Sequence, residues 1–424
     1  MKTLIKNGRV VDPASGLDGR YDILIENGRI CDVRDHIQTT AQSVIEAENC
    51  IVMPGLIDLH VHLRDPGYTD KETIETGTRA AAAGGFTTIC AMPNTKPVMD
   101  TPEKIRAFYE RAVVSASVNV IQLGAITVGQ NGTELADIAG MGRAGCHAVS
   151  EDGKSVMDGK LAEQAMKTAA DNGIGVFAHC EDIRLVNGGV VNHDIAEKLG
   201  LPGIIDEAEN VITARDIEIA RRTGAHLHLY HCSTAGSVEL IRKAKTEGVQ
   251  VTAEVCPHHF TLSTEDIPGD DANYKMNPPL RTREDVAVLK EALSEGIIDT
   301  IATDHAPHTA AEKSRSMKDA PFGITGLETA LGLAVTELTE PGFLTMMQLA
   351  CRMSYAPARI LGIEKGSLEI GKIADVVIFD PAFEYTVRSE TMLSKGKNSP
   401  FIGRKLRGRV LYTLRAGEII YQLR

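Results

Sequence analysis

Apolar runs of strand length recur at regular intervals through the middle of the chain. Eight of them follow one another, at residues 55–60, 86–92, 118–124, 145–149, 174–179, 225–231, 249–255 and 298–303. Helix-like segments lie between many of these runs, for example at 71–83, 158–172 and 235–246. Short apolar runs that alternate with helical patterns are typical of parallel βαβ units. Eight such units over residues 54–364 predict an α/β fold, a (β/α)8 TIM barrel, better than an open doubly wound sheet.

The two ends of the chain differ from this middle part because they lack helical periodicity. The N-terminal end contains two Asn-Gly pairs between apolar residues, and each pair is a strong hairpin signal. Residues 365–380 and 407–421 read as further short strands with glycine turns. Chain termini often lie close together in folded proteins. We therefore expect residues 1–53 and 365–424 to form one small composite β-sandwich domain beside the barrel.

The composition is that of an ordinary globular protein, with 43% hydrophobic and 24% charged residues. The formal net charge of −12 argues against a general nucleic-acid-binding surface. No apolar run approaches the roughly 20 residues of a membrane span, and the N-terminus lacks the features of a secretory signal. The eight cysteines are scattered without a CxxC pair, which indicates buried thiols in a reducing compartment. These features predict a cytoplasmic protein with a small-molecule substrate and no nucleic-acid or membrane partner.

Residues suited to catalysis fall at the carboxyl ends of the predicted strands. The first strand ends at His60 and His62, which share one face because residues two apart in a strand point the same way. Further strands end at Asp152, His179, His231 and Asp304. The catalytic groups of barrel enzymes gather at this end of the barrel. Imidazole and carboxylate groups are zinc ligands, so the six residues together predict a metal site.

The number of these residues suits two ions better than one. Six protein ligands are too many for one tetrahedral catalytic ion that keeps an open position. Shared between two ions about 3.5 Å apart, they leave room for a bridging carboxylate and a bridging hydroxide. Asp152 is the natural bridge, because a carboxylate offers two oxygens. In the single-metal alternative, His60, His62 and Asp304 hold the ion, and the other two histidines face the substrate.

Six short motifs run in order through the predicted barrel. They are His60-Val-His-Leu-Arg64-Asp-Pro-Gly, Met92-Pro-Asn94-Thr, Glu151-Asp152-Gly153, Asn277-Pro-Pro-Leu-Arg281, Asp304-His-Ala-Pro-His308 and Pro321-Phe-Gly-Ile-Thr-Gly-Leu-Glu-Thr329. Each motif alone is weak evidence. The set in this order resembles the class I dihydroorotases of the amidohydrolase superfamily, and the composite β-domain agrees with that family.

The resemblance implies a reaction and its cofactors. The reaction is the reversible cyclisation of N-carbamoyl-L-aspartate to L-dihydroorotate in pyrimidine biosynthesis, which is the hydrolysis of a cyclic amide in reverse. Two Zn²⁺ ions per subunit are implied, with His60, His62 and Asp304 on one, His179 and His231 on the other, and Asp152 between them. A metal-bridging hydroxide is then the nucleophile, and Asp304 is the general acid and base.

The resemblance also implies substrate contacts and partners. Arg64, Asn94 and His308 match the residues that hold the substrate carboxylate in this family. Asn277 and the backbone around Phe322 and Gly323 match those that face the pyrimidine ring. A homodimer is the commonest closed assembly, and an association with an aspartate transcarbamoylase is a further expectation.

Several assignments near these motifs are open or structural. Many relatives bridge their metals with a carbamylated lysine, where this chain has Glu151 and Asp152; we favour Asp152 as the bridge because it directly precedes Gly153. We expect Lys154 to be a solvated loop lysine and residues 312–318 to form a solvated loop. His147, His226 and His228 are expected to be structural, and His305 to orient its loop without being a ligand. His258 and His259 are expected on opposite faces of a strand, one supporting the site from behind the ligands and the other structural. His36 and His193 have no motif around them.

Two rival functions have discriminating features. A hydantoinase, dihydropyrimidinase or allantoinase shares the strand-end histidines, but hydantoinases and dihydropyrimidinases usually need the carbamylated lysine and have no fixed cation for a ring carboxylate. Arg64 and Asn94 therefore favour dihydroorotase. A catalytically inactive relative kept as a scaffold typically loses metal ligands, whereas all six candidates are present here.

Overall fold

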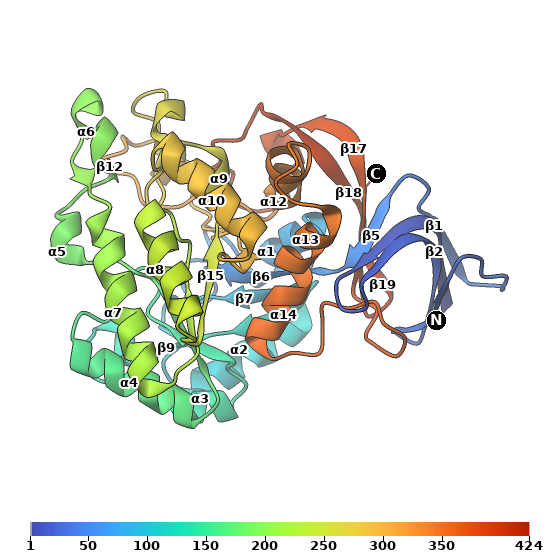
Figure 1. The fold of residues 1–424 in the computed structure, drawn as a ribbon, viewed down its shortest axis with the longest axis horizontal. Coiled ribbons are helices and arrows are strands. Elements are labelled where there is room, and N and C mark those ends of the chain that lie inside the picture. The colour runs from blue at the N-terminus through green and yellow to red at the C-terminus, as the bar shows by residue number, and fades with distance from the viewer. Residues whose placement is uncertain (1, 424) are drawn as a thin grey trace.

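The computed structural model describes residues 2–423, which form a barrel and a smaller β-domain (Figure 1). The barrel strands are β6 (Leu56–Val61), β7 (Phe86–Ala91), β8 (Asn119–Gln122) with its continuation β9 (Gly124–Ala125), β10 (Ala148–Ser150), β11 (Gly175–Ala178), β14 (Leu227–Leu229), β15 (Val251–Val255) and β16 (Thr300–Ile301). Neighbouring strands pair in parallel. A parallel bridge between Val61 and His305 joins the last strand segment to the first. The predicted eight-stranded barrel is therefore confirmed.

Helices follow the strands and cover the outside of the barrel. The main ones are α1 (Ile74–Ala83), α2 (Pro102–Ser115), α3 (Ile138–Arg143), α4 (Gly159–Asp171), α7 (Glu207–Thr223), α8 (Ala235–Thr246), α10 (Arg283–Glu295), α12 (Ala330–Ala334), α13 (Met346–Ala350) and α14 (Ala356–Leu361). Local sequence sets their ends. Thr73 and Thr282 form capping boxes at the first residues of α1 and α10, and Gly224 ends α7 in the left-handed conformation.

Short elements occupy the connections between strands and helices. An excursion after β11 contains α5 (Ile183–Val186), β12 (Val191–Asn192), α6 (His193–Leu199) and β13 (Gly203–Ile204). Two further short helices, α9 (Pro257–Thr261) and α11 (Ala310–Lys313), follow β15 and β16. Both of these lie in loops at the carboxyl end of the barrel, where the candidate residues gather.

The smaller domain combines strands from both ends of the chain. They are β1 (Lys2–Asp12), β2 (Leu17–Glu26), β3 (Arg29–Arg34), β4 (Ser43–Glu46), β5 (Ile51–Pro54), β17 (Val376–Thr386), β18 (Lys405–Arg415) and β19 (Glu418–Gln422). The order is β19-β18-β17-β5-β1-β2-β3, with β4 on β1. The antiparallel pairing of β5 with β17 joins the two ends. In Figure 1 the blue and red strands lie side by side, as the composite β-domain requires.

The two Asn-Gly pairs have different structures. Asn27-Gly28 forms the tight turn between β2 and β3, with φ of 50° and 79°. Asn7-Gly8 lies inside β1, at a shift in its register with β2. The hairpin prediction is wrong at this pair, because the irregularity lets β1 pair with β4 before it and with β5 after it.

The remaining global expectations concern thiols and membranes. All eight cysteines are free; six are buried, Cys351 is half-buried and Cys31 is exposed. Among residues 2–423, every helix is too short or too polar to cross a lipid bilayer.

Candidate metal centre and active site

The predicted site residues converge at the carboxyl end of the barrel. A cavity of about 540 Å³ is lined there by His62, Arg64, Asn94, Asp152, Gly153, His179, His231, Asn277, Asp304, Ala306, Phe322 and Gly323. His60 is fully buried beside this group, and His308 lies against Phe322. All twelve predicted residues therefore lie in or directly beside one cavity.

The end of β6 supplies two imidazoles that face two carboxylates. His60 Nε2 lies 3.2 Å from Asp152 Oδ1 and 3.5 Å from Asp304 Oδ1. His62 Nε2 lies 3.1 Å from Asp304 Oδ1 and 3.4 Å from Asp152 Oδ2. The alternation of a strand predicts this shared direction for residues 60 and 62.

Hydrogen bonds on the far side of each ring fix its orientation. His60 Nδ1 lies 2.9 Å from Glu254 Oε1, and His62 Nδ1 lies 3.1 Å from Asn94 Oδ1. Because both partners are acceptors, both Nδ1 atoms carry the proton, and both Nε2 atoms present a lone pair to the cavity. Partners of this kind orient the histidine ligands of metal sites.

The second pair of histidines comes from β11 and β14. His179 Nδ1 and His231 Nε2 face each other at 2.9 Å. Glu181 Oε2 lies 3.4 Å from His179 Nε2, and Asn277 donates to the other oxygen of Glu181 at 2.9 Å. His179 Nδ1 is also 3.9 Å from Asp152 Oδ1, so Asp152 lies between the two histidine pairs.

The two carboxylates after β10 point in different directions. Glu151 turns away from the histidines and accepts hydrogen bonds from the backbone and hydroxyl of Thr127. Asp152 faces the histidines, and its Oδ2 also accepts from Asn94 Nδ2 at 3.0 Å. Of the two candidate bridges, only Asp152 has oxygens directed at both histidine pairs.

Electrostatics within this cluster favour a bound cation. Burial raises the pKa of Asp152, but His60, His62 and His179 outweigh burial and hold that pKa well below its usual range. Burial lowers the pKa of His60, yet Asp152 and Asp304 raise it well above its usual value. The two carboxylates therefore favour positive charge at the imidazole that they face.

The donor atoms also fit a metal ion by their geometry. Two groups, His60 with Asp152 and His231, and His60 with His62 and Asp304, each place one ligand atom per residue within 4.8 Å of the others. The buried His60 Nε2 has no hydrogen-bond partner. Nitrogen and carboxylate oxygen donors of this kind suit zinc and similar ions. The residues present can therefore hold a metal.

A basic cluster forms the opposite wall of the cavity. Arg64 donates from Nε to Pro307 O at 3.2 Å, and its terminal NH2 group lies 3.2 Å from His308 Nε2. Lys71 Nζ donates to His308 Nδ1 at 3.2 Å and pairs with Glu312 at 2.7 Å. Burial, Arg64 and Lys71 lower the pKa of His308 to about 3, so its ring is neutral near pH 7. With Nδ1 accepting from Lys71, the proton is on Nε2, which donates to Phe322 O at 2.8 Å.

Backbone conformation at the site is unusual. Arg64, His231 and Asp304 have φ of 59°, 32° and 47°. Residues other than glycine seldom adopt positive φ, and such residues cluster at functional sites. Three residues at three strand ends share this strain, which aims their side chains at one cavity.

Several supporting residues were not predicted from the sequence. Glu254 holds both His60 and His228, the latter at 3.1 Å, although nothing marks it except its charge in the middle of the apolar strand β15. Glu181, two residues after His179, and Lys71, just before α1, also went unassigned. A charged residue inside a buried strand is the signal that could have found Glu254.

Most of the histidines expected to be structural are hydrogen-bonded outside the metal cluster. His147 Nδ1 donates to Leu361 O at 3.0 Å, and His226 bonds to Thr252 at 3.0 Å. His305 accepts the backbone N–H of Gly326 at 3.2 Å. The strand expectation for residues 258 and 259 is wrong, because Pro257 begins the short helix α9 and their rings lie 4.3 Å apart.

The loop expectations have mixed outcomes. Lys154 is exposed, as expected, and its Nζ donates to Gln130 O at 2.8 Å. The solvated-loop prediction for residues 312–318 is wrong at Lys313. This side chain is buried and donates to the carbonyl oxygens of Lys275, Pro321 and Gly323. It therefore fixes the loop that carries Phe322.

Comparison with known proteins agrees with this geometry. A family profile described as dihydro-orotase-like matches residues 49–237. A dihydroorotase from Pelotomaculum thermopropionicum is 49% identical over 423 residues, covering 100% of this chain and 99% of the relative. A dihydroorotase from Citrifermentans bemidjiense is 46% identical, with 100% of each chain covered. Among solved structures, an L-hydantoinase from Arthrobacter aurescens aligns with a TM-score of 0.88 at 26% identity, covering 99% of this chain and 96% of that one. The chain is a member of the dihydroorotase family.

Proposed function

We propose that this protein is a zinc-dependent dihydroorotase. The reaction is the reversible cyclisation of N-carbamoyl-L-aspartate to L-dihydroorotate, a step of pyrimidine biosynthesis. The observation that carries the proposal is the pairing of two walls in one cavity. One wall presents lone pairs and carboxylates suited to metal ions, and the other presents Arg64 with the neutral His308. A cyclic amide that bears a carboxylate matches both walls.

The proposed metal ligands are those that the family resemblance implies, and the convergence of their side chains supports them. His60, His62 and Asp304 would hold one Zn²⁺, His179 and His231 the other, and Asp152 both. When bound, zinc lowers the pKa of water and polarises a carbonyl oxygen. The protein's contribution is to place acceptors (Glu254, Asn94 and Glu181) at the far nitrogen of three rings, so that in the neutral ring the other nitrogen has its lone pair free for the metal.

Asp304 is the proposed general base and acid. Its carboxylate lines the cavity beside His60 and His62. In hydrolysis, a bond forms between a water oxygen and the ring carbonyl carbon, and the carbon–nitrogen bond breaks. Asp304 would accept the proton that the water loses and deliver it to the departing nitrogen. In the biosynthetic direction, the same carboxylate would remove a proton from the attacking nitrogen as the carbon–nitrogen bond forms. It would pass that proton to the oxygen whose bond to the carbonyl carbon breaks, and this oxygen leaves as water with a second proton from solvent.

Arg64 and His308 are proposed to orient the substrate. A guanidinium group binds a carboxylate through two parallel hydrogen bonds. With Nε occupied by Pro307 O, the terminal nitrogens of Arg64 are the donors left for a ligand. Asn94, Asn277 and the backbone at Phe322 and Gly323 line the same cavity. Orientation of the reacting groups by such contacts can supply several of the about 7–11 kcal/mol attributed to proximity.

The proposal also covers the domain boundaries and the assembly of the protein. We propose a composite domain of residues 1–53 and 365–424 beside a catalytic barrel of residues 54–364. A homodimer and an association with an aspartate transcarbamoylase stay predictions.

The experiment that tests the function compares four rings. Zinc-loaded protein is incubated with L-dihydroorotate, hydantoin, dihydrouracil and allantoin, and hydrolysis is measured for each. Turnover of dihydroorotate alone is the expected result. Turnover of an uncharged ring instead would favour a hydantoinase and leave Arg64 without a substrate partner. Absence of turnover for every ring, with zinc shown to be bound, would favour an inactive scaffold.

A further inference from the structure

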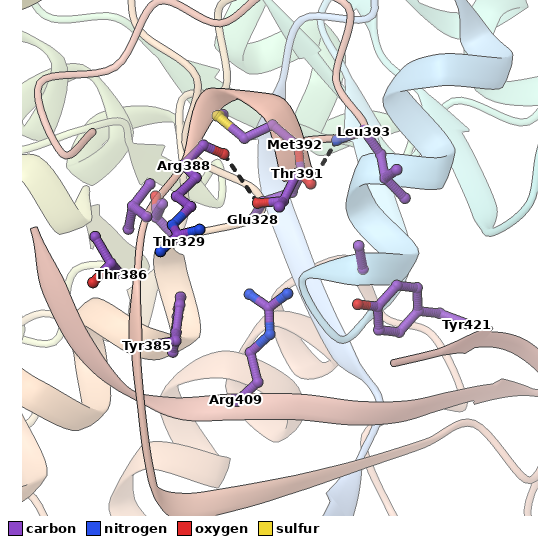
Figure 2. Close-up of a pocket in the computed structure, with 12 residues that line it drawn as sticks. Glu328, Thr329, Tyr385, Thr386, Arg388, Thr391, Met392, Leu393, Arg409 and Tyr421 are labelled. Carbon is purple, nitrogen blue, oxygen red and sulfur yellow. Dashed lines mark hydrogen bonds between the residues drawn. The ribbon is translucent and has the colours of Figure 1, made fainter. Parts of the chain in front are cut away.

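Residues 394–398, here named the C-terminal strap, cross from the small domain onto the barrel. They lie between β17 and β18, in a connection that leaves the β-domain. Glu328 fixes the start of this connection, because its carboxylate accepts the backbone N–H groups of Leu393 at 2.7 Å and Ser394 at 3.0 Å. Figure 2 shows the bond from Leu393 to Glu328 beside the pocket that these residues line. The strap is thus attached to the barrel before it reaches the active site.

The first half of the strap contacts a buried carboxylate. Ser394 Oγ donates to Glu72 Oε2 at 2.5 Å, and Lys395 N donates to the same carboxylate at 3.2 Å. Glu72 also lies 3.4 Å from His305 Nε2. His305 follows the proposed catalytic Asp304 directly, so this half of the strap reaches the loop that carries Asp304.

The close approach at Gly396 depends on its missing side chain. A Cβ at this position would lie 2.6 Å from the Cβ of Pro307. Pro307 directly precedes His308. The strap is therefore packed against the loop of residues 304–308 at van der Waals distance.

Asn398 uses its whole amide to join two active-site loops. Its Nδ2 donates to Ala306 O at 3.1 Å and to Gly323 O at 3.0 Å. Its Oδ1 accepts the backbone N–H of His308 at 2.9 Å. The side chain is 4% exposed, so these bonds are not shared with bulk solvent. One buried side chain thus ties the loop of Ala306 and His308 to the loop of Gly323.

The two loops carry the proposed contacts to the substrate. His308 and Gly323 lie beside each other, since a Cβ on Gly323 would be 3.3 Å from His308 Nε2. Lys313 Nζ donates to Gly323 O at 2.9 Å as well, so Asn398 and Lys313 hold this carbonyl from two sides. Without Asn398, Ala306 O and the His308 N–H would lose this buried partner, while Gly323 O would keep Lys313. An unpaired buried polar group is costly.

We infer that Asn398 is a positioning residue for substrate binding, acting through His308 and Gly323 without touching the substrate. The inference rests on the proposed dihydroorotase function. It assigns the C-terminal part of the chain a role in the active site, although the motifs of the site all lie within the barrel. It also predicts that an amide is required at residue 398, because the position needs two donors and one acceptor.

The test measures the binding of orotate, a planar analogue with the same ring carboxylate. Zinc-loaded wild type, Asn398→Ala and Asn398→Asp are titrated with orotate by calorimetry. We expect Kd to rise about 10-fold for Asn398→Ala, and further for Asn398→Asp, which places an oxygen against the two carbonyls. In turnover of dihydroorotate, KM should rise more than kcat falls, and zinc content should equal that of the wild type.

The matched control is Ser399→Ala. Ser399 is also buried, and its hydroxyl accepts the N–H of Phe401 at 3.3 Å. A purely structural role for this segment would change stability in both variants and leave KM alone. Orotate binding by a folded Asn398→Ala protein within two-fold of the wild type would overturn the inference, as would wild-type affinity in Asn398→Asp. If the wild type itself neither bound orotate nor hydrolysed dihydroorotate, the proposed function would fail, and the inference with it.

Discussion

Histidines at the two ends of the barrel differ in burial and in partners: His147 is exposed and His226 half-buried, whereas His60, His62, His179 and His231 are buried. At the amino end, His147 bonds to Leu361 O at 3.0 Å, and His226 bonds to the Thr252 hydroxyl at 3.0 Å. At the carboxyl end, His60 and His62 face carboxylates, and His179 faces His231 at 2.9 Å. In the first arrangement each ring has one protein partner, and at least part of the ring is open to solvent. The second leaves lone pairs converging on one point, where only a proton or a metal ion can satisfy them.

Cavity volume alone would place the active site at the amino end of the barrel. The cavity at the amino end, beside His147 and His226, has a volume of about 980 Å³, against about 540 Å³ at the carboxyl end. Yet the larger cavity has no convergent set of ligands among the described residues. The candidate active site is therefore identified by convergent histidine and carboxylate side chains and not by cavity volume.

The largest expected effect is on turnover and comes from replacing the carboxylate of Asp304 by an amide at the carboxyl end of the barrel. Asp304→Asn should lower kcat about 10³-fold, the scale of general acid–base catalysis, while orotate binding changes little. The control is Asp299→Asn at the other end of β16, where the carboxylate bonds to Lys245 at 2.7 Å. Steady-state kinetics and metal analysis of both variants check this. Near wild-type turnover in Asp304→Asn would show that another group moves the proton.

The next effect concerns the basic wall. Arg64→Met should raise KM for dihydroorotate about 100-fold, because two charge-assisted hydrogen bonds of about 1.5 kcal/mol each are lost. Arg79→Met, which removes an exposed arginine from α1, should leave KM unchanged. Both KM values come from the same hydrolysis assay. An unchanged KM in Arg64→Met would give Arg64 a structural role only.

The smallest expected effect is on stability and comes from a substitution at the amino end of the barrel. Burial lowers the pKa of His226 to about 4, so between pH 6.5 and 4 the unfolded chain binds a proton that the folded chain does not. The free energy of unfolding therefore falls as pH falls through this window. In His226→Gln, the free energy of unfolding should fall by about 1–2 kcal/mol less than in the wild type over this pH range, after allowance for the partial exposure of the ring.

Denaturant unfolding at pH 4 and pH 7 measures this difference, with His36→Gln on the exposed surface as the control. Activity at pH 7 should be unchanged in His226→Gln. A drop in activity would place the amino end in the function and remove the contrast between the two ends.

The sequence predicts the barrel well because its strands are buried on both faces and its helices are periodic. The helix expected at 235–246 matches α8 (Ala235–Thr246) in both bounds. Strand-end residues such as His60 and Asp304 could be found for the same reason, since a barrel forces strand ends together. Their ligand roles stay predictions.

Contacts between distant segments could not be predicted in this way. Glu254 bonds to His60 across 194 residues, and Asn398 bonds to Ala306 across 92. No periodicity links such partners, because each depends on how two loops or strands meet in space. Asn7-Gly8 shows the same limit locally, since its role depends on β4 and β5 and not on its own sequence.

The central proposal is that the carboxyl end of the barrel binds two metal ions. Metal-free protein titrated with Zn²⁺ and weighed by native mass spectrometry tests it most directly. We predict two zinc ions per chain for the wild type and for His226→Gln, and a loss of at least one for His179→Ala. A single zinc that persists in His179→Ala would contradict the claim and support one ion held by His60, His62 and Asp304.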